Sequence, residues 1–332
     1  MLRFALFGAG RIGRLHAANV SSHPHAALVS VYDVLAPAAR EVAERFGATV
    51  APSVDAALAD ASVDAVLIAS STPTHVDLIT RAARAGKAVL CEKPIDLDIA
   101  RVERCREEIA GHRVPVQIGF NRRWDPSHRS LALAVRAGEI GGVEQVVITS
   151  RDPGPPPLAY LATSGGLFRD MMIHDFDLAR FILGEDPAEV SATGSALVDP
   201  AVASVDDVDS AMVWMKTASG KLCHINNSRR ATYGYDQRVE AFGSAGMLIS
   251  NNRTATTVER YTATATAVRD PLLNFFIDRY ADAYRNQVND FIDAVASGRE
   301  PSPGFEDGRR ALILADAALE SLQTGKVVKV RY

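Results

Sequence analysis

Short apolar segments alternate with amphipathic ones along the first third of the chain. Five apolar runs of strand length lie at residues 2–7, 26–33, 64–70, 88–94 and 114–120. Segments with helical spacing separate several of them, at residues 36–46, 75–86 and 98–110. Buried strands that alternate with helices are typical of a doubly wound parallel sheet. The pattern therefore predicts an α/β Rossmann domain over residues 1–122.

The pattern changes after about residue 122, where strand-like stretches follow one another in series. They lie at residues 144–152, 188–197, 209–217, 220–229, 236–244, 246–251 and 254–262. Helical spacing is confined to the segments around 127–138, 168–184, 277–297 and 305–323. We therefore predict an α+β domain over residues 123–332 with a large, mostly antiparallel open sheet. Because these helices are too few to cover both faces of such a sheet, we expect a second subunit to cover one face.

Length, charge and cysteine content narrow the class of protein. A chain of 332 residues is long enough for two domains. Its net charge of −4 argues against a nucleic-acid partner. Three cysteines without CxxC spacing cannot all pair, which favours a reducing compartment. We find neither a secretory signal nor an apolar run of the roughly 20 residues that a membrane span needs, and we expect a cytoplasmic protein without a membrane partner.

The first apolar run ends in the sequence GAGRIG, which has the G-x-G-x-x-G pattern at Gly8, Gly10 and Gly13. A glycine-rich hexamer alone is weak evidence, but here a strand precedes it and a helical segment follows. The next strand ends in Asp33, 20 positions after Gly13. This context is the dinucleotide-binding fingerprint, with a pyrophosphate on the helix N-terminus and an acidic residue for the ribose. Because the Asp33 carboxylate would repel a 2′-phosphate, we predict NAD rather than NADP.

The carboxyl ends of the predicted parallel strands form a second group of candidates, because ligands collect at that edge. The segments 70–75, 91–94 and 120–125 lie there. Lys93 either is a surface residue that follows a strand or is a cation held near the nicotinamide, and Pro94 ends the strand beside it. The predicted cofactor contacts are Gly8, Gly10, Arg11, Ile12, Gly13, Asp33, Ser71, Thr72, Pro73, His75, Glu92 and Lys93.

A line of ionisable residues marks the segment GGLFRDMMIHDFDLARF at 165–181. On a helix predicted over 168–184, Asp170, His174 and Asp177 fall on one narrow stripe beside an apolar face. The stripe is a solvated surface, a metal site or a proton relay. The pattern H-E-x-x-H is absent and the cysteines are scattered, so a metal is not predicted. Next to a nucleotide-binding domain the relay is favoured, because histidine titrates near working pH and a carboxylate can orient its ring.

Together these motifs resemble the inositol dehydrogenase branch of the glucose–fructose oxidoreductase/inositol dehydrogenase family. The resemblance rests on G-x-G-x-x-G, Asp33, EKP at 92–94 and the Asp-x-x-x-His segment at 165–177. More specific are SRDPGPPP at 150–157, SRRATYGYDQRVEAFGSAGM at 228–247 and RYADAYRNQVNDFIDA at 279–294. It spans almost the whole chain. Trp124 departs from the smaller aromatic residue that is more familiar at its position, which could narrow the pocket.

The resemblance implies a Rossmann domain, a sheet domain used for assembly of a homotetramer, and no metal. It implies that Lys93, Asp170 and His174 are the catalytic residues. The segments that would line a sugar or cyclitol site contribute the further candidates Arg123, Asp152, Tyr233 and Tyr235. For these four the alternatives stay open, since Arg123 could form an ordinary ion pair and the tyrosines could pack in the core. The role of Asp177 is left unassigned.

The implied reaction is NAD-dependent oxidation of the axial hydroxyl of myo-inositol. In this hypothesis His174 takes the hydroxyl proton, Asp170 orients the imidazole, and Lys93 stabilises the reacting oxygen. A sibling activity on another cyclitol or a pyranose sugar, such as scyllo-inositol, D-chiro-inositol or glucose, is the nearest alternative. A non-catalytic NAD-binding sensor and a zinc alcohol dehydrogenase are more remote, and the three candidate catalytic residues argue against the sensor.

Overall fold

A computed structural model describes residues 1–332, and the chain divides into two compact units. The first contains Met1–Asn121 together with Ala283–Leu312, and the second contains Arg122–Asp282 and Ile313–Tyr332. A C-terminal segment that the sequence analysis placed in the second domain therefore packs with the first. The reason is visible in the core of the first unit, where Val288, Phe291 and Ile292 pack in one hydrophobic cluster with Phe4.

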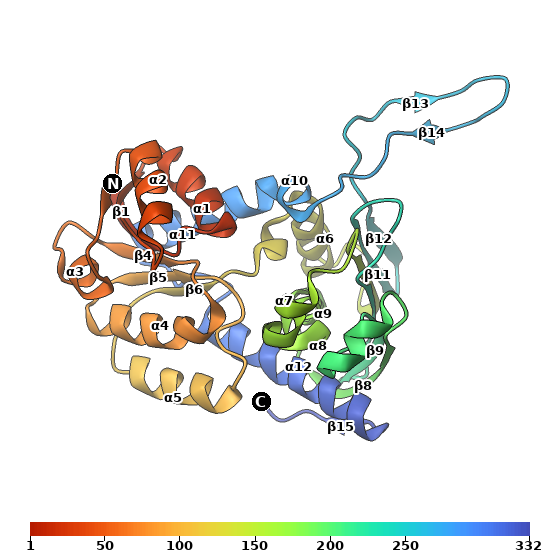
Figure 1. The fold of residues 1–332 in the computed structure, drawn as a ribbon. Coiled ribbons are helices and arrows are strands. Elements are labelled where there is room, and N and C mark those ends of the chain that lie inside the picture. The colour runs from red at the N-terminus through yellow and green to blue at the C-terminus, as the bar shows by residue number, and fades with distance from the viewer. The chain divides into compact units, whose positions relative to one another are not determined.

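The first unit contains the predicted parallel sheet (Figure 1). Its six strands lie in the order β3-β2-β1-β4-β5-β6, and every neighbouring pair is parallel. The strands are β1 (Leu2–Phe7), β2 (Ala26–Tyr32), β3 (Thr49–Val50), β4 (Ala65–Ile68), β5 (Ala88–Cys91) and β6 (Val116–Ile118). The helices are α1 (Arg11–Ser21), α2 (Ala36–Phe46), α3 (Val54–Ala59), α4 (His75–Arg84), α5 (Ile99–Ile109) and most of α11 (Ala281–Ser297). The predicted Rossmann class is confirmed.

The second unit contains a seven-stranded sheet in the order β12-β11-β7-β10-β9-β8-β15. Its strands are β7 (Val143–Arg151), β8 (Pro187–Ser195), β9 (Ser210–Thr217), β10 (Leu222–Ser228), β11 (Asp236–Gly243), β12 (Gly246–Ser250) and β15 (Val328–Lys329). Only β7 and β10 run parallel, and the other pairs are antiparallel. The predicted mostly antiparallel sheet is therefore confirmed. The predicted strand at 254–262 is instead reduced to β13 (Glu259–Arg260), which pairs only with β14 (Val268–Arg269) in a separate hairpin.

The two faces of this sheet differ in what covers them. The inward residues of β9, including Val213 and Met215, share a hydrophobic core with Phe176 of the helix α9 (Ile173–Leu183). Helices α6 (Pro126–Arg136), α7 (Leu158–Ser164), α8 (Gly166–Asp170), α10 (Phe276–Arg279) and the last part of α12 (Phe305–Thr324) complete the unit. Several outward positions, among them Met212, Trp214 and Met247, remain exposed. None of the helices combines the length and hydropathy that crossing a bilayer requires.

The helix predicted over 168–184 is not continuous, and this corrects the single stripe of Asp170, His174 and Asp177. Helix α8 ends at Asp170, and α9 begins at Ile173. Between them the main chain turns tightly, because the N–H groups of Met171 and Met172 both donate to Leu167 O. A periodicity argument cannot detect such a break, since the residues around it are apolar and buried in either arrangement.

Candidate active site

The glycine loop after β1 has the shape that a dinucleotide needs. Gly8 has a φ of +97°, and a Cβ there would lie 2.5 Å from the main chain at Ala69. A Cβ on Gly13 would lie 1.9 Å from Gly8 O, so helix and strand can approach only with glycine at this position. A Cβ on Gly10 would meet nothing within 4 Å, and no side chain caps the N-terminus of α1. The uncapped end of α1 therefore faces open space into which a pyrophosphate fits.

Asp33 lies directly against this loop, as the fingerprint predicts. Its Oδ2 accepts a hydrogen bond from Ala9 N–H at 2.6 Å, and its Oδ1 accepts one from Leu35 N–H at 2.7 Å. The next two residues, Val34 and Leu35, are exposed and carry no charge. A carboxylate fixed beside the loop with no cation in the residues that follow it suits the two hydroxyls of an NAD ribose.

The turn at 70–75 supplies the next group of predicted cofactor contacts. Thr72, Pro73 and Thr74 form a 3₁₀ turn, and the hydroxyls of Ser70 and Thr74 lie 2.6 Å apart. The side chain of His75, another predicted cofactor contact, is engaged within the protein. The ring is 1% exposed, with Nδ1 2.8 Å from Pro94 O and Nε2 3.1 Å from Ser70 O. Both nitrogens therefore face main chain of the protein itself.

Lys93 follows β5 in the first unit and is half-buried. The residue before it, Glu92, has Oε1 2.7 Å from Nε2 of His16 on α1. The carboxylate of Glu92 is therefore engaged within the protein, and its predicted contact with the cofactor stays a prediction. The other two predicted catalytic residues, Asp170 and His174, belong to the second unit.

Asp170, at the end of α8, accepts hydrogen bonds at both carboxylate oxygens. The hydroxyl of Tyr160 on α7 donates to Oδ1 at 2.9 Å, and Nη2 of Arg229 donates to Oδ2 at 3.3 Å. The Arg229 side chain is only 2% exposed, so its charge is held next to Asp170 with little screening. Burial and the neighbouring Asp170 raise the pKa of Tyr160, so its hydroxyl stays protonated and able to donate. His174, the second residue of α9, is half-buried.

Arg123 and Asp177 form a buried ion pair. Arg123 donates from Nε to Oδ2 at 2.7 Å and from Nη2 to Oδ1 at 2.5 Å. The side chains are 6% and 1% exposed. Of the two alternatives for Arg123, the structure shows the ion pair, and the guanidinium also lies over the Phe181 ring. Asp177 is the partner that keeps this charge buried.

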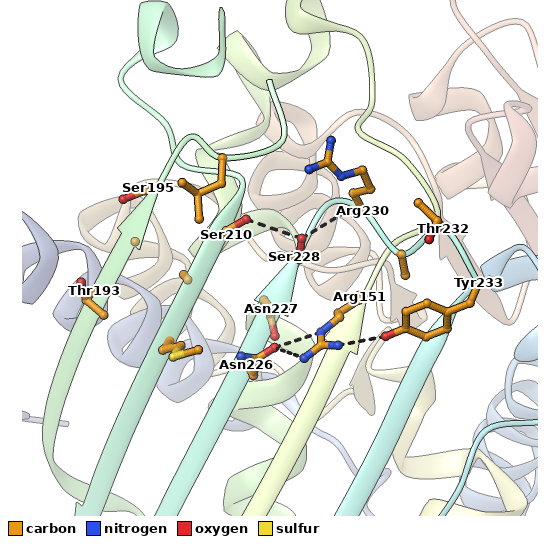
Figure 2. A pocket seen from close by; sticks show the side chains of 15 residues that line it. Arg151, Thr193, Ser195, Ser210, Asn226, Asn227, Ser228, Arg230, Thr232 and Tyr233 are labelled. Atoms are coloured by element: carbon orange, nitrogen blue, oxygen red, sulfur yellow. Dashed lines mark hydrogen bonds between the residues drawn. The ribbon is translucent and has the colours of Figure 1, made fainter. Parts of the chain in front are cut away.

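Asp152, Tyr233 and Tyr235 lie in different surroundings. Burial and the nearby carboxylates of Asp170 and Asp175 raise the pKa of Asp152 to about 6. Tyr233 is half exposed and lines a pocket of about 520 Å³ at the outer face of the sheet, where its hydroxyl accepts from Arg151 (Figure 2). The same hydroxyl donates to Asp236. Tyr235 is buried, with its ring edge-on to Tyr280.

Comparisons with known proteins decide the family. Residues 2–120 match the oxidoreductase family with an NAD-binding Rossmann fold, and residues 128–249 match the GFO/IDH/MocA C-terminal domain. The chain belongs to the GFO/IDH/MocA oxidoreductase family. An inositol 2-dehydrogenase of Rhizobium meliloti is 48% identical, over 99% of both chains. A myo-inositol 2-dehydrogenase of Thermotoga maritima is 44% identical, over 99% of this chain and 98% of its own.

A solved structure adds evidence on the cofactor of the family. The scyllo-inositol dehydrogenase of Lactobacillus casei, solved with NAD(H) and scyllo-inositol, has a TM-score of 0.91 to this chain at 28% identity, over 99% of both chains. The glycine loop and Asp33 described above fit that dinucleotide, so this oxidoreductase uses NAD. No group of three or more His, Cys, Asp or Glu side chains is placed to hold a metal ion.

Sequence reasoning missed a second buried ion pair in this family member. Arg122 contacts Asp175 and donates from Nη1 to Ser150 Oγ at 3.1 Å, and Asn227 donates from Nδ2 to Asp175 Oδ2 at 3.0 Å. Burial raises the pKa of Asp175, although Arg122 opposes that shift. The doubled arginines at 122–123 and the acidic pair at 175 and 177 were the available signal. The two arginines are adjacent and the two aspartates lie two positions apart, and only Arg123 of the four was assigned to the site.

Proposed function

We propose that this protein is a dehydrogenase that oxidises the axial secondary hydroxyl of myo-inositol to 2-keto-myo-inositol (scyllo-inosose), with NAD⁺ as the hydride acceptor. One observation carries the proposal: the chain matches an inositol 2-dehydrogenase from end to end at 48% identity. The cofactor loop and the Lys93, Asp170 and His174 motifs agree with this activity. We assign cofactor binding to the first unit, and substrate binding and assembly to the second.

In the proposed mechanism the hydroxyl proton leaves to His174 while the carbon-bound hydrogen leaves as hydride. The bound NAD⁺ supplies the electrophilic ring that accepts this hydride. His174 is a suitable base because an imidazole titrates near neutral pH. Asp170 stabilises the imidazolium and is itself fixed by Tyr160 and Arg229. The ammonium of Lys93 stabilises negative charge on the substrate oxygen.

We assign substrate contacts to Asp152, Tyr233 and Tyr235, in addition to Asp170 and His174. A carboxylate is a strong acceptor for the hydroxyl groups of a cyclitol, and Asp152 supplies one close to Asp170. Arg123, the remaining candidate, supports the site through its ion pair with Asp177. The test is steady-state NAD⁺ reduction with myo-inositol by wild type, Lys93→Met and His174→Gln.

Each of the two variants is expected to lower kcat by a factor on the order of 10²–10⁴, while the Kd for NAD⁺ in a fluorescence titration changes less than threefold. Lys326→Met is the matched control, because this lysine is exposed between α12 and β15. Near-normal turnover of either variant would remove the role assigned to that residue. Absence of NAD⁺ reduction by the wild type with myo-inositol would overturn the substrate assignment.

A sibling activity on scyllo-inositol is the second candidate, and one observation favours it. A scyllo-inositol 2-dehydrogenase of Bacillus subtilis is also similar over 99% of this chain, at 33% identity. The two substrates differ in the orientation of one hydroxyl, so kcat/KM measured with both, and with D-chiro-inositol and glucose, decides between them. A protein that binds NAD but reduces it with none of these polyols would instead be a sensor.

We also propose that the protein assembles as a homotetramer through the outer face of its seven-stranded sheet. Register places six exposed apolar residues on this one face: Met212, Trp214, Leu222, Phe242, Met247 and Ile249. Exposed apolar residues gathered on one face of a sheet are typical of a protein–protein interface. The variant Trp214→Glu is expected to lower the molar mass measured by light scattering, and an unchanged tetramer would place the interface elsewhere.

The three buried, unpaired cysteines fit a cytoplasmic location.

A further inference from the structure

The position of Lys93 depends on the main chain at its two sides, because the ladder of the parallel sheet ends just before it. The last main-chain bonds of this segment within the sheet run from Glu92 N–H to Ile68 O at 2.9 Å and from Gly119 N–H to Cys91 O at 2.7 Å. Strand β5 itself ends at Cys91. A lysine side chain is long and flexible, so something else must fix the segment from which it projects.

On the N-terminal side of Lys93, the carboxylate of Glu92 is held by His16. The His16 ring is completely buried on α1, and its Nε2 lies 2.7 Å from Glu92 Oε1. Its Nδ1 has no hydrogen-bond partner, so the contact with Glu92 is the polar bond that this ring makes. Tyr284 packs edge-on against the ring at 5.6 Å between centroids. Gly119 closes the other side of Glu92, because a Cβ there would lie 2.9 Å from Oε2.

On the C-terminal side of Lys93, the carbonyl of Pro94 is held by His75. Nδ1 lies 2.8 Å from Pro94 O, and Nε2 lies 3.1 Å from Ser70 O. Burial lowers the pKa of His75, so the ring is neutral at working pH and carries a single N–H. We assign this N–H to Nδ1, where the contact is shorter. The ring thus donates to Pro94 O in the segment after β5, whereas Nε2 lies against Ser70 O without donating to it.

We propose that His16 and His75 are positioning residues that clamp the main chain on both sides of Lys93 and so direct its ammonium toward the reacting oxygen. This clamp rests on the role of Lys93 under the proposed function. Both histidines lie on helices that follow the predicted cofactor loops. His16 lies on α1, one turn beyond the glycine loop, and His75 is the first residue of α4. The clamp therefore connects the segment of Lys93 to the backbone that holds the dinucleotide. Catalytic groups need such support, because displacements of about 1 Å lower rates strongly.

Two pairs of variants test the clamp in the full-length protein. His16→Leu and His75→Leu remove the contacts but keep an apolar side chain in the buried space. His16→Gln and His75→Asn each place an amide nitrogen close to the position of the ring nitrogen that makes the contact. We would measure kcat and both KM values, the apparent Tm, and amide hydrogen–deuterium exchange over residues 92–98 in the protein without cofactor. His128→Leu, a buried histidine of the second unit, is the control for loss of stability alone.

Each leucine variant is expected to lower kcat at least tenfold and to accelerate exchange over 92–98, whereas KM for the polyol changes less than threefold. The glutamine and asparagine variants are expected to recover kcat to within threefold of wild type and to restore slow exchange. The His128→Leu control is expected to lower Tm with exchange over 92–98 unchanged.

Three results would overturn the clamp: unchanged exchange over 92–98 in both leucine variants, no recovery in either amide variant, or equally fast exchange in the His128→Leu control. The exchange measurement requires no turnover. Faster exchange with rescue in a protein whose wild type reduces no NAD⁺ with any cyclitol would leave the clamp standing and refute the proposed function.

Discussion

Removal of the Asp177 carboxylate is expected to destabilise the second unit strongly. The change Asp177→Asn keeps the size of the side chain but removes the charge that accepts two hydrogen bonds from Arg123. Arg180 also lies near, with Nη1 4.0 Å from Asp177 Oδ1, although Asp186 gives Arg180 a second partner at 2.5 Å. Arg123 is 6% exposed, so solvent cannot replace the lost carboxylate.

The magnitude follows from the burial of both partners. Breaking a buried ion pair by removal of one partner costs about 3–5 kcal/mol, because the other charge stays buried without compensation. The charge left behind also lies near Arg136, whose guanidinium packs on the same Phe181 ring as that of Arg123. For a unit of this size about 1 kcal/mol corresponds to roughly 2–4 °C, so the apparent Tm should fall by about 6–20 °C.

Differential scanning fluorimetry of wild type, Asp177→Asn and the double variant Arg123→Met with Asp177→Leu measures this effect. The double variant should recover most of the lost Tm, because apolar side chains then replace the whole pair. Glu41→Gln is the matched control, since its ion pair with Arg14 is exposed and exposed pairs contribute little. A loss of less than 2 °C for Asp177→Asn, or a double variant no more stable than the single one, would refute the reasoning.

Three further predictions follow from the same contacts. Tyr160→Phe removes the hydroxyl that donates to Asp170, and kcat should fall roughly three- to tenfold with unchanged NAD⁺ affinity; unchanged kcat in steady-state kinetics contradicts this. Because the pKa of Asp152 is raised to about 6, wild type loses stability as pH rises from about 4 to about 6, so the Tm of Asp152→Asn relative to wild type should rise over this range and level off above it; a difference constant with pH counts against it. Gly119→Ala places a methyl group 2.9 Å from Glu92 Oε2 and should accelerate exchange over residues 92–98 in the apoprotein; exchange as slow as in wild type excludes the contact.

The features predicted from sequence are those that depend on local pattern. Gly8, Gly13 and Asp33 could be assigned because the tight turn, the close helix–strand approach and the acidic end of β2 each need a particular residue type at a fixed spacing. The alternation of strands and helices likewise gave the parallel sheet, since every strand of that sheet carries its own apolar signal. By contrast, the predicted boundary at residue 122 missed Val288 and Phe291. These residues pack in the core of the first unit although more than 160 residues of the second unit precede them in the chain.

Pairing between distant charged residues was the part that spacing could not determine. The stripe of Asp170, His174 and Asp177 was read as one surface, but the break between α8 and α9 separates Asp170 from the helix that carries the other two. The two aspartates then have different partners: Asp170 binds Tyr160 and Arg229, whereas Asp177 binds Arg123. These partners are 10 to 59 residues apart in the sequence. The periodicity of a single helix cannot predict contacts over such distances. A line of charges along a segment therefore marks a candidate site, but which charge pairs within the fold depends on the arginines that other elements bring to it.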